Sequence, residues 1–471
     1  MVFSSLVFVC IFLPVVLILH SVIGNRKVKN GLLLAASLLF YAFGEPVYIL
    51  LMLVSALFNY FFARLLVNHR KKVLLVLAVI VNIGLLGVFK YTGFLVTNFN
   101  TTFGLSLPVP QISLPIGISF FTFQALSYVI DVYRDAVDVQ KSYWKLLLYI
   151  SFFPQLIAGP IVRYVDVARE IDERTVNTRQ IAFGLRRFIV GLGKKVLIAN
   201  AMGAAADYIF NHGAANINML GAWIGAVAYL MQIYYDFSGY SDMAIGLGKM
   251  FGFHFKENFN YPYISCTIQE FWRRWHISLS SWFKDYVYIP LGGNRKGKVR
   301  AVLNRIIVFF LTGLWHGANW TFIVWGLFHG FFLLLETFIP LIKKLPKVLL
   351  HIYTLLTVTI GFVIFRADTI GEAFLFICQM FSGTAFTPQT MSFAIQALTP
   401  YFICMLLAAI LCCGPFAKLA QRVRVLEDKQ TLSSGENALQ IISFVLAFLL
   451  LAWCIIRLAG GSYNPFIYFR F

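Results

Sequence analysis

A histidine inside an apolar stretch is the first residue whose chemistry needs an explanation. Residues 312–320 read Thr-Gly-Leu-Trp-His-Gly-Ala-Asn-Trp, and the apolar run that leads to His316 begins near Val302. Fourteen residues of helix rise roughly 21 Å, which places this imidazole well inside a membrane. Ionisable groups at that depth are expensive and mark functional sites. Because burial disfavours the charged form, the ring is neutral at pH 7 and can act as a general base. The alternative is a structural histidine that donates to a carbonyl.

A second histidine, His276, lies at the edge of an apolar helical stripe, four positions after Trp272. The two histidines are forty residues apart, which matches no metal-ligand spacing, and the seven cysteines show none either. The sequence contains no His-Glu-x-x-His motif, so we expect no metal site. It also lacks a nucleophile elbow, which argues against a Ser-His-Asp triad. We expect His276 to position the substrate or His316, and the alternative is an interfacial histidine without a chemical role.

The amino-acid composition indicates that the helices carrying these histidines lie in a membrane protein. Hydrophobic residues make up 59% of the 471 residues and charged residues 13%, whereas soluble domains have about 45–50% and about 25%. The apolar stretches lack the alternation of an outer-membrane β-barrel. The net charge is +19, and the basic residues lie in short loops between apolar runs. The positive-inside rule explains this distribution, so the charge does not indicate nucleic-acid binding. The sequence therefore predicts an all-α polytopic membrane protein.

Charge asymmetry between loops predicts the topology. The loops that follow residues 24, 67, 131 and 341 are basic, while 91–114 and 211–217 carry no charged residue. Basic loops stay in the cytoplasm, so both termini are expected outside the cytoplasm. Candidate crossings, each near the length that a bilayer requires, are 2–24, 31–44, 47–67, 73–90, 115–131, 187–210, 217–236, 302–316, 320–341, 349–366, 396–414 and 439–459.

Two segments do not read as simple crossings. Residues 142–160 contain Pro154, Gly159 and Pro160 between basic flanks, which predicts a broken, re-entrant element covered by protein. Residues 237–301 are mixed and aromatic, and they contain a stripe that predicts one amphipathic helix, either interfacial or dipping into the core. The stripe consists of Ile268, Trp272, Trp275, Leu279, Trp282 and Tyr286. Just before it, Asp236 and Asp242 are expected to cap the N-terminus of a helix.

Three motifs together resemble the membrane-bound O-acyltransferase (MBOAT) family. They are Phe-Trp-Arg-Arg-Trp-His-Ile-Ser at 271–278, Asp-Tyr-Val-Tyr-Ile-Pro-Leu-Gly-Gly-Asn-Arg at 285–295, and Gly-Leu-Trp-His-Gly-Ala-Asn at 313–319. The match is to the bacterial branch of alginate and peptidoglycan O-acetylation membrane proteins, which residues 152–160 and 236–242 also resemble. The resemblance covers nearly the whole chain and is densest over 115–330.

The resemblance implies the fold and the reaction. We expect one membrane domain over 1–471, with about 11–13 transmembrane helices plus re-entrant and interfacial helices around a central tunnel, and with 115–330 as its catalytic core. His316 is then the catalytic base, reached from both membrane faces, with His276 assisting it. Acetyl-CoA or an acyl carrier would enter from the cytoplasm of a bacterium. We expect the phosphates of this donor to face the basic residues Arg273, Arg274, Lys284 and Arg295. Trp315 and Asn319 would support the site.

The predicted reaction is an acetyl relay across the cytoplasmic membrane to a secreted or cell-wall polysaccharide. No polymer-binding domain is recognisable, so the resemblance implies a separate extracytoplasmic esterase-like (SGNH-type) transferase as the partner. We expect no bound cofactor and no nucleic-acid partner, and membrane lipid surrounds the helices.

The C-terminal residues 462–471, Ser-Tyr-Asn-Pro-Phe-Ile-Tyr-Phe-Arg-Phe, are strongly aromatic for a segment expected outside. One interpretation is an aromatic belt at the outer interface. The other is that the tail folds back through Gly460 and Gly461 into the tunnel, where Tyr468 accepts the acetyl group. Residues 466–471 resemble the acyl-acceptor motif of envelope acylation systems. Tyr463 lies outside that motif and is the natural comparison.

Three other functions remain open from the sequence. D-alanyl transfer to teichoic acids uses a carrier-protein donor, which the sequence does not separate from free CoA. A lipid acyltransferase of the same family is disfavoured by the bacterial-type motifs. A polysaccharide or lipid flippase would leave His316 with a structural role, and it would not consume a thioester.

Overall fold

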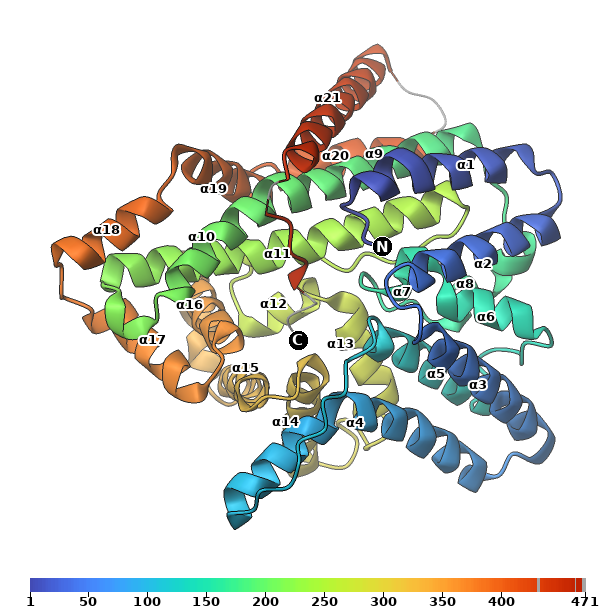
Figure 1. Cartoon of the computed structure of the whole chain (residues 1–471), viewed down its shortest axis with the longest axis horizontal. Helices are drawn as coiled ribbons and strands as arrows, with labels where there is room; N and C mark the ends of the chain where they lie inside the picture. Colours follow the sequence, from blue (N-terminus) through green and yellow to red (C-terminus); the bar gives the residue numbers. More distant parts are fainter. Residues whose placement is uncertain (430–432, 462, 468–471) are drawn as a thin grey trace. The chain divides into compact units, whose positions relative to one another are not determined.

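The computed structural model describes residues 1–429, 433–461 and 463–467 (Figure 1). Within these ranges the chain folds into helices joined by turns and loops, and no β-strand is among them. The predicted all-α fold class is confirmed. The chain divides into two compact units, one of Met1–Phe188 with Met243–Lys256 and the other of Ile189–Asp242 with Glu257–Phe471. The expected single domain over 1–471 stays a prediction.

The first unit is built from the N-terminal helices around a core of phenylalanine rings. The rings of Phe8, Phe12 and Phe40 lie 5.4–6.2 Å from the ring of Phe153. Its helices are η1 (Phe8–Phe12, a π-helix), α1 (Leu13–Val22), α2 (Arg26–Ala42), α3 (Ile49–His69), α4 (Lys72–Phe103), α5 (Ile118–Tyr133), α6 (Tyr143–Ser151), α7 (Phe153–Leu156) and α8 (Tyr164–Glu173), with the first part of α9 (Thr178–Gly193) and the last part of α11 (Met219–Met250).

The predicted break within 142–160 lies between α6 and α7. Phe152 leaves the helical region with ψ of 111°, and α7 continues for four residues to Leu156. The backbone amide of Phe153, which the break leaves without a helical partner, donates a hydrogen bond to Ser37 Oγ at 3.1 Å inside the protein. Residues 146–162 are all buried, as broken helices at membrane depth require. The break is confirmed, and its re-entrant placement in a membrane stays a prediction.

The second unit contains the remaining helices. Its helices α14, α15 and α16 pack side by side (Figure 1), and α12 lies against α15 and α16. The elements are η2 (Lys194–Ala199, a π-helix), α10 (Asn200–Asn211), η3 (Ala214–Asn216), η4 (Pro262–Ile264), α12 (Ile268–Arg274), α13 (Ile277–Phe283), η5 (Lys284–Tyr288, a π-helix), α14 (Lys298–His316), α15 (Trp320–Phe338), η6 (Pro340–Lys344), α16 (Lys347–Arg366), α17 (Ile370–Ser382), α18 (Pro388–Ala397), α19 (Pro400–Cys413), α20 (Ala417–Asp428) and α21 (Ser434–Ala459).

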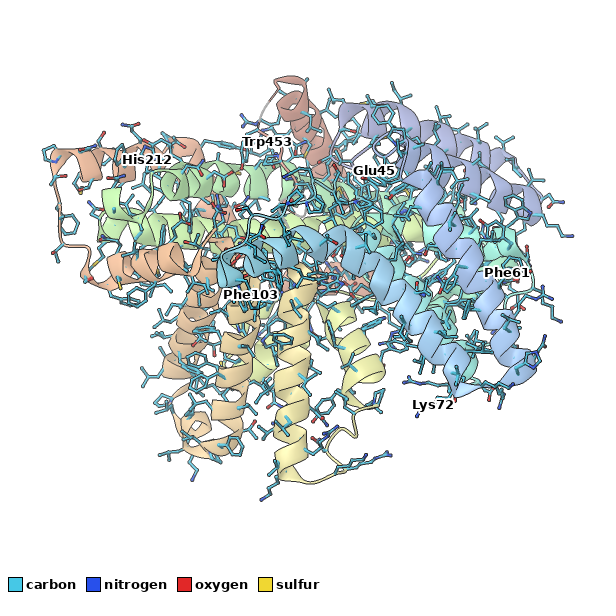
Figure 2. All side chains as sticks on the ribbon, turned by 60° about the horizontal axis from the view of Figure 1, so that its bottom comes forward. Glu45, Phe61, Lys72, Phe103, His212 and Trp453 are labelled. Carbon is cyan, nitrogen blue, oxygen red and sulfur yellow. The ribbon has the colours of Figure 1, made fainter. Side chains whose placement is uncertain are left out.

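Seven helices among the described residues are long and apolar enough to cross a membrane, and the bent pair α18 and α19 makes an eighth if it is one span. Only 17% of the most apolar window is buried in α4 and in α21, so these helices present apolar side chains outward as lipid-facing helices do. Figure 2 shows such side chains, with Phe61 on α3 and Trp453 on α21 labelled. The candidate spans are Ile49–His69, Lys72–Phe103, Thr178–Asn211, Lys298–His316, Trp320–Phe338, Lys347–Arg366 and Ser434–Ala459, with shorter apolar helices at Phe8–Val22, Ile118–Tyr133 and Ile370–Ser382.

Two local predictions are wrong. The amphipathic stripe does not form one helix, because α12 ends at Arg274 and α13 begins at Ile277, with His276 between them in the left-handed region at φ 43°. The residues of the stripe are nonetheless all buried in the protein. Asp236 and Asp242 do not cap a helix N-terminus, since both lie inside α11. Their carboxylates instead pair with lysines of the neighbouring π-helix η2.

Candidate active site

His316 is the last residue of α14, and the turn that follows fixes its position. Gly317 is extended, and Asn319 caps α15 by accepting from the Thr321 amide at 3.1 Å. The Asn319 amide group also donates to the Asp368 carbonyl at 2.9 Å. Asn319, expected to support the site, therefore closes the loop between the two helices that build it.

Two glycines bring α14 and α15 into backbone contact just before His316. A Cβ atom at Gly313 would overlap the carbonyl oxygen of Phe322, and one at Gly326 would overlap the carbonyl oxygen of Phe309. Both positions therefore require glycine. This close approach holds the end of α14 rigidly against α15.

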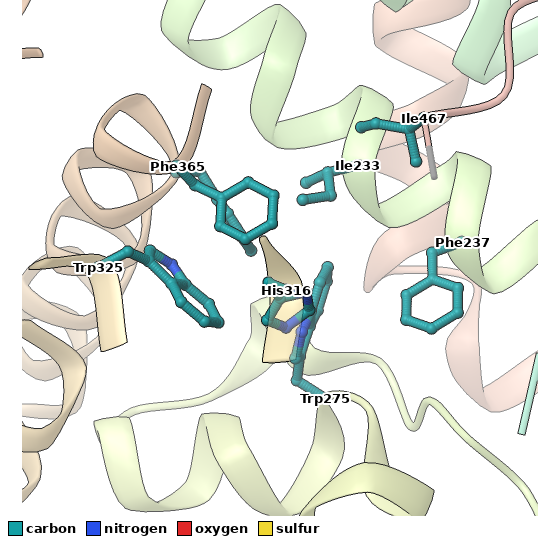
Figure 3. Close-up of a pocket in the computed structure, with 8 residues that line it drawn as sticks. Ile233, Phe237, Trp275, His316, Trp325, Phe365 and Ile467 are labelled. Carbon is teal, nitrogen blue, oxygen red and sulfur yellow. The ribbon is translucent and has the colours of Figure 1, made fainter. Parts of the chain in front are cut away.

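His316 lines a small apolar cavity of about 20 Å³, enough for about one water molecule. Figure 3 shows the imidazole among the rings of Trp275, Trp325 and Phe365. The His316 side chain is almost buried, at 9% exposure. The other residues of the lining are Ile233, Phe237, Phe362 and Ile467.

Aromatic rings contact the His316 imidazole by their edges. Its ring centroid lies 5.0 Å from those of Trp315 and Trp325, and 5.2 Å from that of Phe365, at interplanar angles of 77–90°. Such walls hold the imidazole in one orientation and exclude water.

His276 is buried in the protein at 1% exposure, so its ring faces neither lipid nor water. Its Nδ1 lies 3.2 Å from Asn258 Oδ1. The same oxygen accepts from the backbone amide of Ser278 at 3.1 Å and from its hydroxyl at 2.9 Å. Because this oxygen can only accept hydrogen bonds, Nδ1 of His276 must be the donor and carries the ring proton.

This assignment leaves Nε2 of His276 as a proton acceptor. The atom is buried and has no hydrogen-bond partner among the described residues. Burial lowers the pKa of His276 to about 3, so the ring is neutral at pH 7. The left-handed backbone at His276 is a strained conformation for a residue other than glycine, and such strain clusters at functional sites.

The structure brings the two predicted histidines to one aromatic cluster. The Trp315 ring lies 5.0 Å from that of His316 and 6.0 Å from that of His276, centroid to centroid. Phe237 lines the His316 cavity and also contacts the His276 ring at 4.6 Å. Trp315, predicted as a supporting residue, is thus one side chain that contacts both imidazoles.

The predicted basic residues lie apart from the cavity lining. Arg274 pairs with Glu270 at 2.9 Å and donates to the Asn260 carbonyl at 3.0 Å. Arg273, Lys284 and Arg295 are exposed. Their contact with a donor stays a prediction. In the part of the chain that the structure describes, no group of three or more His, Cys, Asp or Glu side chains has the arrangement of a metal site.

The C-terminal tail reaches the cavity as far as it is described. Ile467 lines the cavity and is 6% exposed, and Phe466 is equally buried with its ring stacked on Tyr240 at 4.6 Å. Tyr463 is half-exposed, and its hydroxyl donates to Asp207. Burial, together with this hydrogen bond, raises the pKa of Tyr463. Tyr468 lies outside the described residues.

Sequence reasoning missed several residues of the site. Asn258 lies 18 residues before His276 in no recognisable motif, so the sequence carried no signal for it. Trp325 carried a weak signal, because Phe322, Trp325 and His329 follow helical spacing on α15. Ile233, Phe362 and Phe365 belong to apolar helices whose inward faces are not distinguished by composition.

Comparison with known proteins identifies the family of the chain. Residues 118–367 match the model of the MBOAT, membrane-bound O-acyltransferase family. A probable alginate O-acetylase of Azotobacter vinelandii is 39% identical over all of both chains. A peptidoglycan O-acetyltransferase of Helicobacter pylori is 35% identical over 100% of this chain and 97% of its own.

A third relative matches less of the chain. A teichoic acid D-alanyltransferase of Bacillus subtilis is 32% identical over 46% of this chain and 57% of its own. The matched family region contains both His276 and His316. The chain belongs to the membrane-bound O-acyltransferase family and is an acyltransferase.

Proposed function

We propose that this protein relays acetyl groups from cytoplasmic acetyl-CoA through the bacterial inner membrane, for O-acetylation of a secreted or cell-wall polysaccharide. The observation that carries the proposal is the cavity in which His316 and the tail residue Ile467 meet. The names of the relatives support an alginate-type or peptidoglycan-type polymer as the final acceptor.

In the first step the acetyl group moves from sulfur to oxygen. His316 accepts the phenol proton of Tyr468 while the phenol oxygen attacks the thioester carbonyl. The C–S bond breaks, an acetyl–tyrosine ester forms, and the thiolate of CoA takes the proton from His316. A phenol, with a pKa of about 10, loses its proton to an imidazole more readily than an aliphatic alcohol does. Its ester is also the better donor for the next step.

In the second step an extracytoplasmic SGNH-type transferase takes the acetyl group from the tail. Its nucleophilic hydroxyl attacks the acetyl–tyrosine ester and takes the acetyl group onto its oxygen. The C–O bond to Tyr468 breaks, and the proton lost by the hydroxyl regenerates the phenol of Tyr468. Neutral His276, with Nε2 as an acceptor, keeps the first step free of a competing positive charge beside His316. Exposed basic residues such as Arg273 and Lys284 would meet the phosphates of the donor.

The test uses purified protein in lipid vesicles with labelled acetyl-CoA. Mass spectrometry of the C-terminal peptide should find a hydroxylamine-labile acetyl group on Tyr468. Tyr468→Phe removes one oxygen and should block transfer to the partner, whereas Tyr463→Phe should keep most of it. A Tyr468→Phe protein with normal transfer would eliminate the relay and leave the tail as an aromatic belt.

D-alanyl transfer is the second candidate, because 46% of the chain matches a teichoic acid D-alanyltransferase. The same assay separates the two when D-alanyl carrier protein replaces acetyl-CoA as the donor. A flippase would leave both thioesters intact.

A further inference from the structure

A buried ion pair in the second unit has no part in the chemistry described above. Lys195 of η2 and Asp236 of α11 have side chains that are 3% and 1% exposed, and Nζ lies 3.0 Å from Oδ1. Removing two charges from water is costly, and a buried pair often stabilises a fold no better than apolar residues would. Its presence therefore calls for a function other than stability.

Both members of the pair bind the backbone of the C-terminal tail. The ammonium group of Lys195 donates to the carbonyl of Pro465. The other carboxylate oxygen of Asp236, Oδ2, accepts from the amide of Ile467 at 2.8 Å. Hydrogen bonds to charged groups are about twice as strong as neutral ones. The pair thus holds two backbone groups that flank Phe466, whose ring stacks on Tyr240 of the same helix α11.

Further contacts anchor the start of the same segment. The Asn200 amide group donates to Asn464 Oδ1 at 3.2 Å. Tyr463 donates to Asp207, which pairs with Arg366 at 2.5 Å. Arg366 ends α16, the helix that carries the cavity residues Phe362 and Phe365. The tail is therefore tied to the helices that line the His316 cavity.

We propose that the Lys195–Asp236 pair is a clamp that positions the C-terminal tail at the His316 cavity. Lys195 and Asp236 are positioning residues, because they act on the tail backbone rather than on the reacting atoms. The tail follows Gly460 and Gly461, and a free segment after two glycines loses much conformational entropy on docking. The clamp offsets that loss with contacts that do not depend on the tail side chains. The inference rests on the proposed function insofar as the tail carries the acyl acceptor.

The experiment compares two double variants of the full-length protein. Lys195→Met with Asp236→Asn removes both charges, so no unpaired charge remains buried. Lys194→Met with Asp242→Asn makes the same change in the adjacent pair, whose Nζ–Oδ2 distance is 2.6 Å and whose carboxylate also faces Arg424 at 3.8 Å. The two pairs belong to the same elements, η2 and α11. Only the first pair binds the Pro465 carbonyl and the Ile467 amide in the described contacts.

Two readouts are measured on each protein. Hydrogen–deuterium exchange of the C-terminal peptide reports whether the tail is docked, and it needs no substrate. Acetyl labelling of that peptide by acetyl-CoA reports whether the tail is positioned for transfer. We expect the Lys195–Asp236 variant to lose exchange protection and to label about tenfold or more slowly, since small misplacements cost that much or more. The Lys194–Asp242 variant should retain both properties.

A third variant acts from the tail side and leaves the buried pair intact. Ile467→Pro removes the backbone N–H that donates a hydrogen bond to the Asp236 carboxylate. It should reproduce the loss of protection and of labelling, even if the charge variants fold poorly. Unchanged exchange protection in both the Lys195–Asp236 variant and Ile467→Pro would overturn the clamp. The proposed function fails on a different result, which is normal transfer by Tyr468→Phe in an otherwise unaltered chain.

Discussion

At the residue scale the two histidines have different surroundings, and we expect different roles for them. His316 meets aromatic edges and lines a cavity that the tail reaches. His276 has one nitrogen bound to Asn258 and the other without a described partner. The first arrangement suits a base that meets a substrate, and the second suits a neutral neighbour held in one tautomer.

Replacing His316 by alanine should abolish acetyl transfer while the protein still inserts and folds. Loss of a general base lowers rates by about 10²–10⁴-fold. Turnover of purified His316→Ala with labelled acetyl-CoA measures the effect. His69→Ala is the control, because His69 is exposed at the end of α3. Near-normal turnover in His316→Ala would show that another group is the base.

His276→Ala should cause a smaller but clear loss, through the position of the donor or of His316. Asn258→Asp tests whether the His276 ring must be neutral, since it places a carboxylate beside Nδ1, now 3.2 Å from the Asn258 oxygen. A negative charge there favours the imidazolium and raises the pKa of His276. The activity of this variant should then fall as the pH decreases toward the raised pKa. The pH profile of the wild-type protein should show no such decrease near neutral pH.

The control for this pH profile is Asn211→Asp, which adds the same charge at an exposed position of α10. Its profile should match that of the wild-type protein. If Asn258→Asp also keeps the wild-type profile, the protonation state of His276 has no bearing on the reaction.

At the scale of elements, the crossing of α14 and α15 determines where His316 lies. The two helices touch backbone to backbone only because Gly313 and Gly326 lack side chains. Helices approach this closely in membranes through small residues, since lipid supplies no hydrophobic force between them. The site therefore depends on two residues that contact no substrate.

Gly326→Ala should destabilise the protein and reduce turnover, because its Cβ would overlap the Phe309 carbonyl. Overpacking of this kind costs about 1–3 kcal/mol. Gly371→Ala is the matched change in α17, where the nearest atom to the new Cβ is 3.9 Å away. Alanine is the better helix former, so this control should be neutral or slightly stabilising. Thermal unfolding in detergent and turnover are measured for both, and equal melting temperatures would refute the role of the crossing.

At the scale of the whole molecule, the direction of transfer depends on which loops face the cytoplasm. The charge asymmetry predicts that Arg134, Arg174 and Lys298 face the cytoplasm and that Asn98 faces outside. In the structure Arg174 is buried against the Phe251 carbonyl, so it is a poor labelling site. Arg134 and Lys298 are exposed and suit the test.

Single cysteines at 134 and 298, in a background without the seven native cysteines, should resist an impermeant maleimide added outside intact cells. A cysteine at Thr101, exposed on the same helix as Asn98, should react. Labelling at 298 from outside would invert the topology and the direction of the relay.

The sequence by itself determined that apolar helices face lipid and that His316 lies at the end of a helix. Apolar runs longer than a core helix needs must face lipid, and turn residues after His316 had to end α14 there. The break after α6 followed from prolines and glycine in the same way. These properties are local, because each depends on residues within a few positions of one another.

Only the tertiary structure decided which buried polar groups meet. The sequence did not predict that Asn258 would hold His276, or that Asp236 would lie inside a helix and bind Lys195 and the Ile467 amide. It also missed the left-handed turn at His276, since the period of the apolar stripe continues through it. The physical reason is that periodicity reports which face is buried, whereas a buried charge or amide is satisfied by any partner that the fold brings within reach. Such partners lie tens to hundreds of residues away, where local patterns carry no information.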